Sequence, residues 1–446
     1  MSNKKEAVVA EEILDAKALT KKKRRKTALK VFLGFLIILA LFVGITTMIS
    51  LIGIQSNINK AHSYGSADCA QLDYSVEDNG YVNIKSDKGL KVMQLTDVHI
   101  GGGWMSIKKD AMAINTVATM IQVEKPDFVV VTGDVSYPVP FQAGTFNNKS
   151  AAKIFAELME TLGVYWTIAY GNHDTEAYSY YTREQLTDFY RSPQYKHCLL
   201  QPGPTDVDGV GNQVINIVNN DGVITRSLIV LDSHSYIDGD ILGIRWLYDN
   251  FHDNQIEWYK NVVLDLASRN QNAVKTLDAA KQKSYADLAK VVPTSAFFHI
   301  AMEEYRLAWT EYLENGCKDT ENVKYRYGRP GEKGKVVYSG IHPDQMFETM
   351  LKMGSTDSTF CGHDHFNNFS LNYKGIDLTY GYSIDYLAYV GIYKIGSQRG
   401  CTIIDYGNHG DIDFHQENYY QDKYRNEARE AVTMQEITTS GMPVFD

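Results

Sequence analysis

Five short segments of the 446-residue sequence combine side chains that bind metal ions. The first offers a carboxylate and an imidazole two residues apart, and the second offers a carboxylate directly after a glycine. The third offers an amide next to an imidazole, again after a glycine. A single histidine and then a pair of histidines two residues apart complete the set. In chain order the candidate ligands are Asp97, His99, Asp134, Asn172, His299, His363 and His365.

The donor atoms of these segments are nitrogen and oxygen, without a thiolate. Such a set suits Fe, Mn or Zn better than a metal that prefers sulfur. Two ions about 3.5–4 Å apart form the usual clamp for hydrolysing phosphate esters. In an extended segment, residues i and i+2 point to the same side, so Asp97 and His99 can face one ion, as can His363 and His365.

Each segment alone is weak evidence, because pairs of this kind occur often by chance. His299 alone would be read as a core histidine, and Gly133 and Gly171 as ordinary turn residues. What favours a metal centre is that all five segments follow short apolar runs. These runs alternate with helix-like stretches, which predicts an α/β core with layered sheets. Folds of this kind place their sites at the carboxyl ends of strands.

The predicted elements follow from these runs. Strands are expected at residues 90–95, 127–131, 164–169, 227–231, 295–298 and 359–361, and helices at 108–123, 151–162 and 343–353. Pro126 ends the first of these helices, because proline cannot continue one. Residues 265–290 are charged and helical with few large apolar side chains, which predicts a helical insertion on the surface. The domain is predicted to cover residues 89–410, followed by an acidic tail at 411–446.

The order of the segments, D-x-H, G-D, G-N-H-[DE], a later histidine and G-H-x-H, resembles the signature of the calcineurin-like metallophosphoesterases. The resemblance covers residues 97–365 and implies a layered sandwich of two mixed β-sheets flanked by helices. It also implies two metal ions, with one aspartate and a hydroxide bridging them. The first ion would be held by Asp97, His99, Asp134 and His365, and the second by Asp134, Asn172, His299 and His363.

The same resemblance implies catalytic roles for two residues beside these ligands. His173 would sit above the ions and stabilise the transition state or protonate the leaving oxygen, and Asp174 would orient the imidazole. The bridging hydroxide would attack phosphorus in line. Phosphate monoesters are the first choice of substrate, and a phosphodiesterase or nucleotidase is the alternative. A non-catalytic binding domain that keeps the fold is the competing class.

A narrower resemblance points to the purple-acid-phosphatase-like group of plants and yeast. It rests on residues 231–233, 297–300, 362–367 and 379–382. The run from Gly133 to Tyr137 also matches the G-D-x-x-Y of true purple acid phosphatases, in which the tyrosine binds iron. Those enzymes have D-x-G in the first segment, whereas His99 occupies that place here. We therefore expect Tyr137 not to be a ligand and the protein not to be purple.

Charge is distributed unevenly along the chain. Residues 1–30 hold ten Lys/Arg and four Asp/Glu, whereas the whole chain has 44 and 54, a net charge of −10. The remainder is therefore acidic, which argues against general nucleic-acid binding. The five cysteines form no CxxC pair, so no zinc ribbon or redox motif is present. The sequence does not decide whether two of them form a disulfide.

Residues 31–54 form an uncharged run of 24 residues, long enough to span a bilayer as a helix. Six consecutive basic residues, 21–26, stand before it. The positive-inside rule predicts a single-pass protein of the cell membrane with residues 1–30 as a cytoplasmic tail and the catalytic domain outside the cytoplasm. A cleaved signal peptide is the alternative, but its apolar core is normally shorter. Residues 55–88 are polar and are expected to form a stalk.

Overall fold

The computed structural model describes residues 2–332, 334–389 and 399–425, which form two compact units, Met1–Ile52 and Gly53–Asp446. The first unit consists of the larger part of helix α1 (Ser2–Ser63). An 18-residue window of this helix has a mean hydropathy of 2.7 and none of it is buried. By length and composition it is the one candidate for a membrane span in the described part of the chain.

Sheet B is the smaller of two mixed sheets in the second unit and contains the first ligand segments. Its order is β14 (Ile412–Asn418), β13 (Gly400–Tyr406), β3 (Leu90–Leu95), β4 (Phe128–Thr132) and β5 (Tyr165–Ala169). Strands β3, β4 and β5 are parallel, with Leu95 opposite Val131 and Val131 opposite Ile168. The carboxyl ends of these three strands therefore lie side by side.

Sheet A is larger and supplies the remaining ligand segments. Over the described residues its order is β1 (Asp73–Val76), β2 (Val82–Lys85), β6 (Gln213–Val218), β7 (Ile224–Val230), β8 (Thr294–Phe297), β10 (Thr356–Cys361), β12 (Ile376–Tyr380), β11 (Ser370–Tyr373) and β9 (Val323–Tyr327). Strands β8 and β10 are parallel, with Phe297 opposite Phe360.

The alternation of side chains along the strands creates three apolar layers. On β4, Phe128 and Val130 face the layer between the sheets, whereas Val129 and Val131 face the helices. Buried strands of this kind are apolar on both faces, which is why their sequences read as continuous apolar runs.

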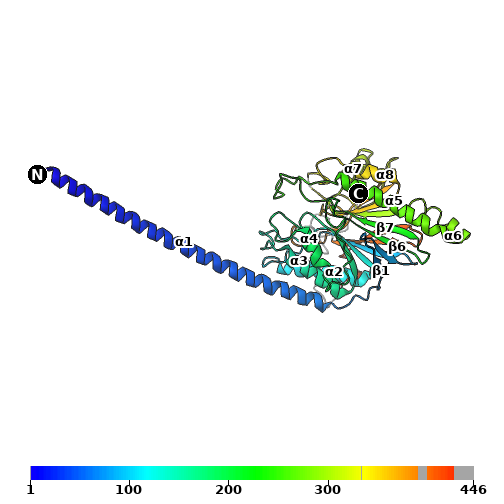
Figure 1. Ribbon diagram of the computed structural model, residues 1–446, viewed down its shortest axis with the longest axis horizontal. Helices are drawn as coiled ribbons and strands as arrows, with labels where there is room; N and C mark the ends of the chain where they lie inside the picture. Colours follow the sequence, from blue (N-terminus) through cyan, green and yellow to red (C-terminus); the bar gives the residue numbers. More distant parts are fainter. Residues whose placement is uncertain (1, 333, 390–398, 426–446) are drawn as a thin grey trace. The chain divides into compact units, whose positions relative to one another are not determined.

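Helices cover the outer faces of the two sheets (Figure 1). Helices α2 (Ile107–Glu124), α3 (Asn148–Leu162) and α4 (Arg183–Tyr190) pack with sheet B. Helices α5 (Asp253–Lys275), α7 (Glu303–Glu314) and α8 (Met346–Met353) pack with sheet A, and α6 (Ala279–Ser284) follows α5. The predicted α/β sandwich of two mixed sheets is confirmed.

Three predicted segments differ from the structure. The expected stalk contains β1 and β2, and Asn57 and Ile58 at the end of α1 are buried in the second unit. The expected surface insertion at 265–290 begins inside α5, whose Leu266 is buried because the helix packs on sheet A, whereas α6 within it has no buried residue. The expected tail at 411–446 begins with β14, which pairs with β13, so the fold continues beyond residue 410, and residues 426–446 lie outside the described residues.

Candidate metal centre

The predicted ligands lie just beyond the carboxyl ends of strands from both sheets. Asp97, Asp134 and Asn172 follow β3, β4 and β5, and His299 follows β8. The fifth segment follows β10, and the backbone N–H of Gly362 donates a hydrogen bond to the carbonyl of His299 at 3.1 Å. Because the two sheets stack with these ends at the same edge, segments more than 260 residues apart meet in one place.

Four of the predicted ligands form one tight buried cluster. The ligand atoms of Asp97, His99, Asp134 and His365 all lie within 4.8 Å of one another. Nε2 of His365 is 3.3 Å from Oδ1 of Asp97, and Nε2 of His99 is 3.3 Å from Oδ2 of Asp134. These are the same four residues that the resemblance assigned to the first ion.

The other predicted ligands adjoin this cluster through Asp134. Nε2 of His299 lies 3.1 Å from Oδ2 of Asp134 and 3.2 Å from Oδ1 of Asn172. Nδ1 of His299 lies 2.7 Å from the carbonyl of Thr132, which directs Nε2 into the site. The ring of His363 packs against that of His299, with centroids 5.1 Å apart. Oδ2 of Asp134 therefore contacts both His99 and His299 and connects the two groups of predicted ligands.

The glycines of the segments are required by close approach. A Cβ at Gly133 would lie 2.4 Å from the His299 ring, and one at Gly171 would lie 2.1 Å from Oδ1 of Asp134. Both distances are far below van der Waals contact. Gly133 and Gly171 are therefore needed because a side chain would collide with the site, and not only because they allow turns.

Four of the seven predicted ligands have left-handed backbone conformations, with φ of 50–74° at Asp97, His99, Asp134 and His363. This region is costly for residues other than glycine, and such strain concentrates at functional sites. The strands and the hydrogen bonds around them hold these residues in place. Asp97 N, for example, donates to Gly133 O at 3.1 Å.

The cluster has the electrostatics of a cation site. Burial opposes charge on Asp97 and Asp134, yet the histidines around them, led by His365 and His299 respectively, hold the pKa of both carboxyls below its usual value. Oδ1 of Asp97 is buried and accepts no hydrogen bond from the described protein atoms. Paired carboxylates with imidazoles, and an oxygen that accepts no hydrogen bond, fit Lewis-acidic metal ions.

Asp385 also belongs to the site, and sequence reasoning missed it. Its Oδ1 lies 3.4 Å from Nδ1 of His99, and its Oδ2 lies 3.3 Å from Nδ1 of His365. Three backbone N–H groups, of residues 387–389, donate to the carboxylate and fix it. Such a contact sets the orientation and tautomer of a metal-binding histidine. No local pattern marks Asp385, because its role exists only where the chain returns to the site.

The expectation that Asp174 orients His173 is wrong in this structure. The carboxylate of Asp174 accepts hydrogen bonds from the backbone N–H groups of Asp134, Ser136 and Gly171, each at 2.9 Å. It therefore joins two ligand loops. Nδ1 of His173 lies 2.6 Å from Oε1 of Glu176 instead. Glu176 stands three residues after the histidine and its side chain is buried, so it takes the orienting place.

Tyr137 lies beside the centre, but its hydroxyl is engaged elsewhere. Its ring stacks on that of His99, with centroids 4.6 Å apart and planes at 16°. Its hydroxyl donates to Oε1 of Gln142 at 2.7 Å. This geometry agrees with the expectation that Tyr137 is not a ligand.

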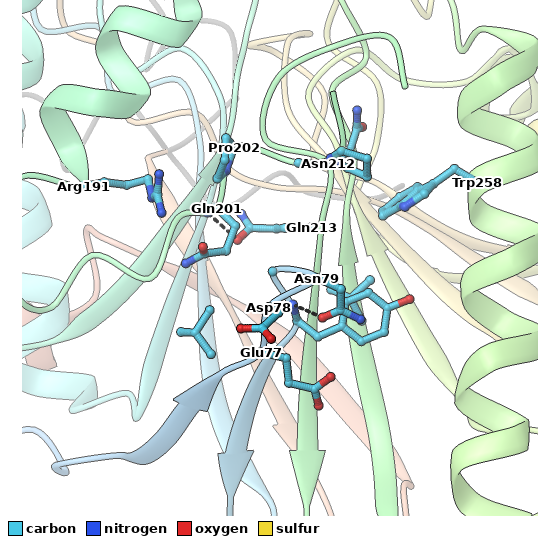
Figure 2. A pocket seen from close by; sticks show the side chains of 15 residues that line it. Glu77, Asp78, Asn79, Arg191, Gln201, Pro202, Asn212, Gln213 and Trp258 are labelled. Carbon is cyan, nitrogen blue, oxygen red and sulfur yellow. Dashed lines mark hydrogen bonds between the residues drawn. The ribbon is translucent and has the colours of Figure 1, made fainter. Parts of the chain in front are cut away.

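A cleft of about 440 Å³ opens onto the metal centre, and His173, His363 and His365 line it. Another cavity, of about 300 Å³, lies at the turn between β1 and β2 and is bounded on other sides by Gln201, Gln213 and Trp258 (Figure 2). No predicted ligand lines the second cavity, and some of its polar groups pair with each other, as in the bond from Gln201 N to Gln213 Oε1. Chemistry is therefore assigned to the first cleft.

Known proteins resemble this chain in sequence. Residues 90–308 match the calcineurin-like phosphoesterase family. The chain is 23% identical to the probable inactive purple acid phosphatase 28 of Arabidopsis thaliana over 69% of this chain and 73% of that protein. It is 26% identical to the probable inactive purple acid phosphatase 29 of the same plant, over 70% of this chain and 76% of that protein. It is 27% identical to the phosphatase DCR2 of Saccharomyces cerevisiae, over 64% and 46%.

Among solved structures, a dimetal phosphatase from Danio rerio is similar, with 10% identity and a TM-score of 0.43 over 74% of this chain and 99% of that one. The sequence match over residues 90–308 and the buried Asp/His cluster together point to a calcineurin-like phosphoesterase domain with a site suited to metal ions.

Proposed function

We propose that this protein is a membrane-anchored phosphatase that hydrolyses phosphate monoesters with two metal ions. The observation that supports it best is the meeting of the predicted ligands at the floor of one cleft, with His173 on its wall. The ligand assignment follows the proximities. Asp97, His99, Asp134 and His365 hold one ion, and Asp134, Asn172, His299 and His363 hold the other.

The bound ions would lower the pKa of a water molecule toward neutrality and stabilise negative charge on the phosphate. The protein's own residues supply orientation and a proton. Asp385 fixes His99 and His365 through their Nδ1 atoms. Glu176 engages Nδ1 of His173, which leaves Nε2 for the substrate. In this arrangement His173 donates its Nε2 proton to the leaving oxygen.

The test compares the full-length protein with His173→Ala, purified in detergent and loaded with Mn, Fe or Zn. We expect hydrolysis of p-nitrophenyl phosphate to exceed that of its bis ester. We also expect His173→Ala to lower kcat roughly a hundredfold or more while metal content stays unchanged. His415→Ala is the matched control, because this histidine is exposed on β14. If the bis ester is the better substrate, the protein is a phosphodiesterase.

A non-catalytic binding domain is the competing function. The word "inactive" in the names of the plant relatives favours it. The retention of every predicted ligand in this chain favours catalysis. A protein that binds two metal ions per chain but hydrolyses neither ester, with any of the three metals, would settle the matter for the binding role.

A further inference from the structure

The wall of the cleft beside the metal centre is built largely of aromatic rings. Tyr389 packs edge-on against His365 with centroids 4.6 Å apart, and Tyr248 packs against His363 at 4.3 Å. Tyr236 stacks on Tyr248 at 5.5 Å. These rings are held by the predicted ligands and by each other, so they form a fixed apolar surface next to the phosphate position.

The outer edge of the cleft is formed by residues 241–246, which we term the rim loop. Leu242 and Trp246 line the cleft and are 53% and 60% exposed. The buried carboxylate of Asp240 holds the loop by accepting hydrogen bonds from Arg245 N and Leu247 N. An antiparallel bridge between Tyr236 and Tyr248 closes its base. The exposed apolar side chains therefore stand on a braced loop.

The backbone conformation of Trp246 also indicates that the rim loop is held in place. Its φ is 55°, a conformation that is an outlier for a bulky residue. Strain of this kind persists where the surroundings impose it, and it clusters at ligand-binding positions. In the described structure, the strained residue Trp246 therefore holds its indole at the mouth of the cleft, where it is mostly exposed to water.

Besides its histidines, the titratable side chains that line the cleft include three carboxyl groups. Glu176 and Glu332 line it, as does Asp364, and no lysine or arginine is among its lining residues in the described chain. Arg245 belongs to the rim loop but does not line the cleft. Among the described residues, a second anionic group on the substrate would thus meet these carboxylates and no lysine or arginine of the cleft lining, which disfavours its binding.

We propose that the cleft selects phosphate monoesters whose alcohol is aromatic or apolar and carries no further anionic group, with Trp246 and Leu242 as specificity residues. This rests on the proposed function, since it assumes that the phosphate sits at the metal centre. The aromatic wall then contacts the alcohol, and stacking on the indole adds to the burial of apolar surface.

Two matched ligand pairs test the proposal on the full-length, metal-loaded protein. Benzyl and ethyl phosphonate, which cannot be hydrolysed, are titrated by calorimetry, and the corresponding phosphate esters are assayed for kcat/KM. Both esters release simple alkoxides, so intrinsic reactivity differs little. Glycerol phosphate and phosphoglycerate form the second pair, which differs by one carboxylate.

We expect the benzyl compounds to bind about tenfold more tightly than the ethyl compounds, and Trp246→Ala to remove most of that preference. We expect phosphoglycerate to have a KM roughly tenfold above that of glycerol phosphate. Ile244→Ala is the matched control. This residue is 73% exposed on the same loop but does not line the cleft, so the preference should persist.

Equal affinity for benzyl and ethyl phosphonate, or a preference that Trp246→Ala leaves intact, would overturn the proposal. Failure of the proposed function has a different signature. In that case neither ester is hydrolysed, while calorimetry still reports whether the cleft discriminates between the two phosphonates.

Discussion

The residues of the metal centre depend on partners that are themselves not ligands. His99 and His365 each have a ring nitrogen turned toward Asp97 or Asp134, and the opposite nitrogen of both faces Asp385. One buried carboxylate therefore sets the orientation of two predicted ligands. Its own position is fixed by three backbone donors, so it has little freedom to adjust.

Replacing Asp385 with asparagine should weaken metal binding. The amide keeps the shape but lacks the charge, and its NH₂ group cannot accept from an imidazole N–H. Metal affinity is expected to fall about 10–100-fold. Dialysis against buffered metal followed by elemental analysis measures this. Asp405→Asn, an exposed carboxylate on β13, is the control. An unchanged metal content in Asp385→Asn would contradict the role.

Replacing Glu176 with glutamine should affect catalysis but not metal binding. The carboxylate contacts Nδ1 of His173, and in the described part of the chain no hydrogen bond or ion pair joins it to a predicted ligand. We expect kcat to fall roughly tenfold with KM and metal content near the wild-type values, a smaller loss than in His173→Ala. Steady-state kinetics with metal analysis tests it. A variant that loses metal would show that Glu176 supports the centre instead.

At the scale of elements, the site is made by strand ends in register. Parallel pairing of β3 with β4 and of β4 with β5 brings the first three segments together, and β8 with β10 does the same for the last two. Helices hold the sheets in place through their apolar faces. Helix α7 follows His299 closely, and its first turn carries Glu303 and Glu304.

Glu304 makes stability depend on pH. Burial, with the nearby carboxylate of Asp344, raises its pKa to about 7 in the folded protein. An unfolded glutamate titrates near pH ~4.3. Below that value both states are protonated and the residue has no effect. As pH rises towards about 7 the unfolded state ionises first, so stability falls, and above about 7 the loss stays constant.

We therefore expect Glu304→Gln to stabilise the protein above neutral pH by roughly 1–3 kcal/mol and to change little at pH ~4. Thermal unfolding of both proteins across this range measures it. Glu314→Gln, at the exposed end of the same helix, should leave the pH profile of Tm unchanged. Parallel Tm profiles for wild type and Glu304→Gln would contradict the assignment.

At the scale of the whole molecule, one apolar helix precedes the unit that contains the candidate metal centre. No residue of its hydrophobic window is buried, as expected of a segment that faces lipid, and a signal sequence would pass the same test. No change of secondary structure marks the predicted boundaries at residues 30 and 54, because α1 runs through both. The basic residues 21–26 are the basis for placing the N-terminus in the cytoplasm.

We expect the full-length protein, with tags at both ends, to stay in the membrane fraction after an alkaline carbonate wash. Protease added outside intact cells should remove the C-terminal tag and spare the N-terminal one. Changing four apolar residues of the span to glutamine should release the protein from the membrane, because each polar side chain in the bilayer is costly. A mature protein that lacks the N-terminal tag would indicate a cleaved signal sequence instead.

The sequence by itself determined the class of fold and the set of predicted ligands. Both depend on short-range sequence patterns. Apolar runs must be buried as strands or helices, and the metal-binding side chains directly follow these runs. Strand β3 was predicted at its observed bounds, and α2 and β4 within about one residue of theirs.

Only the tertiary structure decided which residues support the ligands. Asp385, Glu176 and Asp174 are ordinary acidic residues in the sequence, and their roles depend on which loops meet. It likewise showed that α5 packs on sheet A and that β14 completes sheet B, because burial and strand pairing depend on residues far away in the chain. The aromatic cleft could not be predicted from the sequence for the same reason. Its rings come from loops that approach each other only when the two sheets stack.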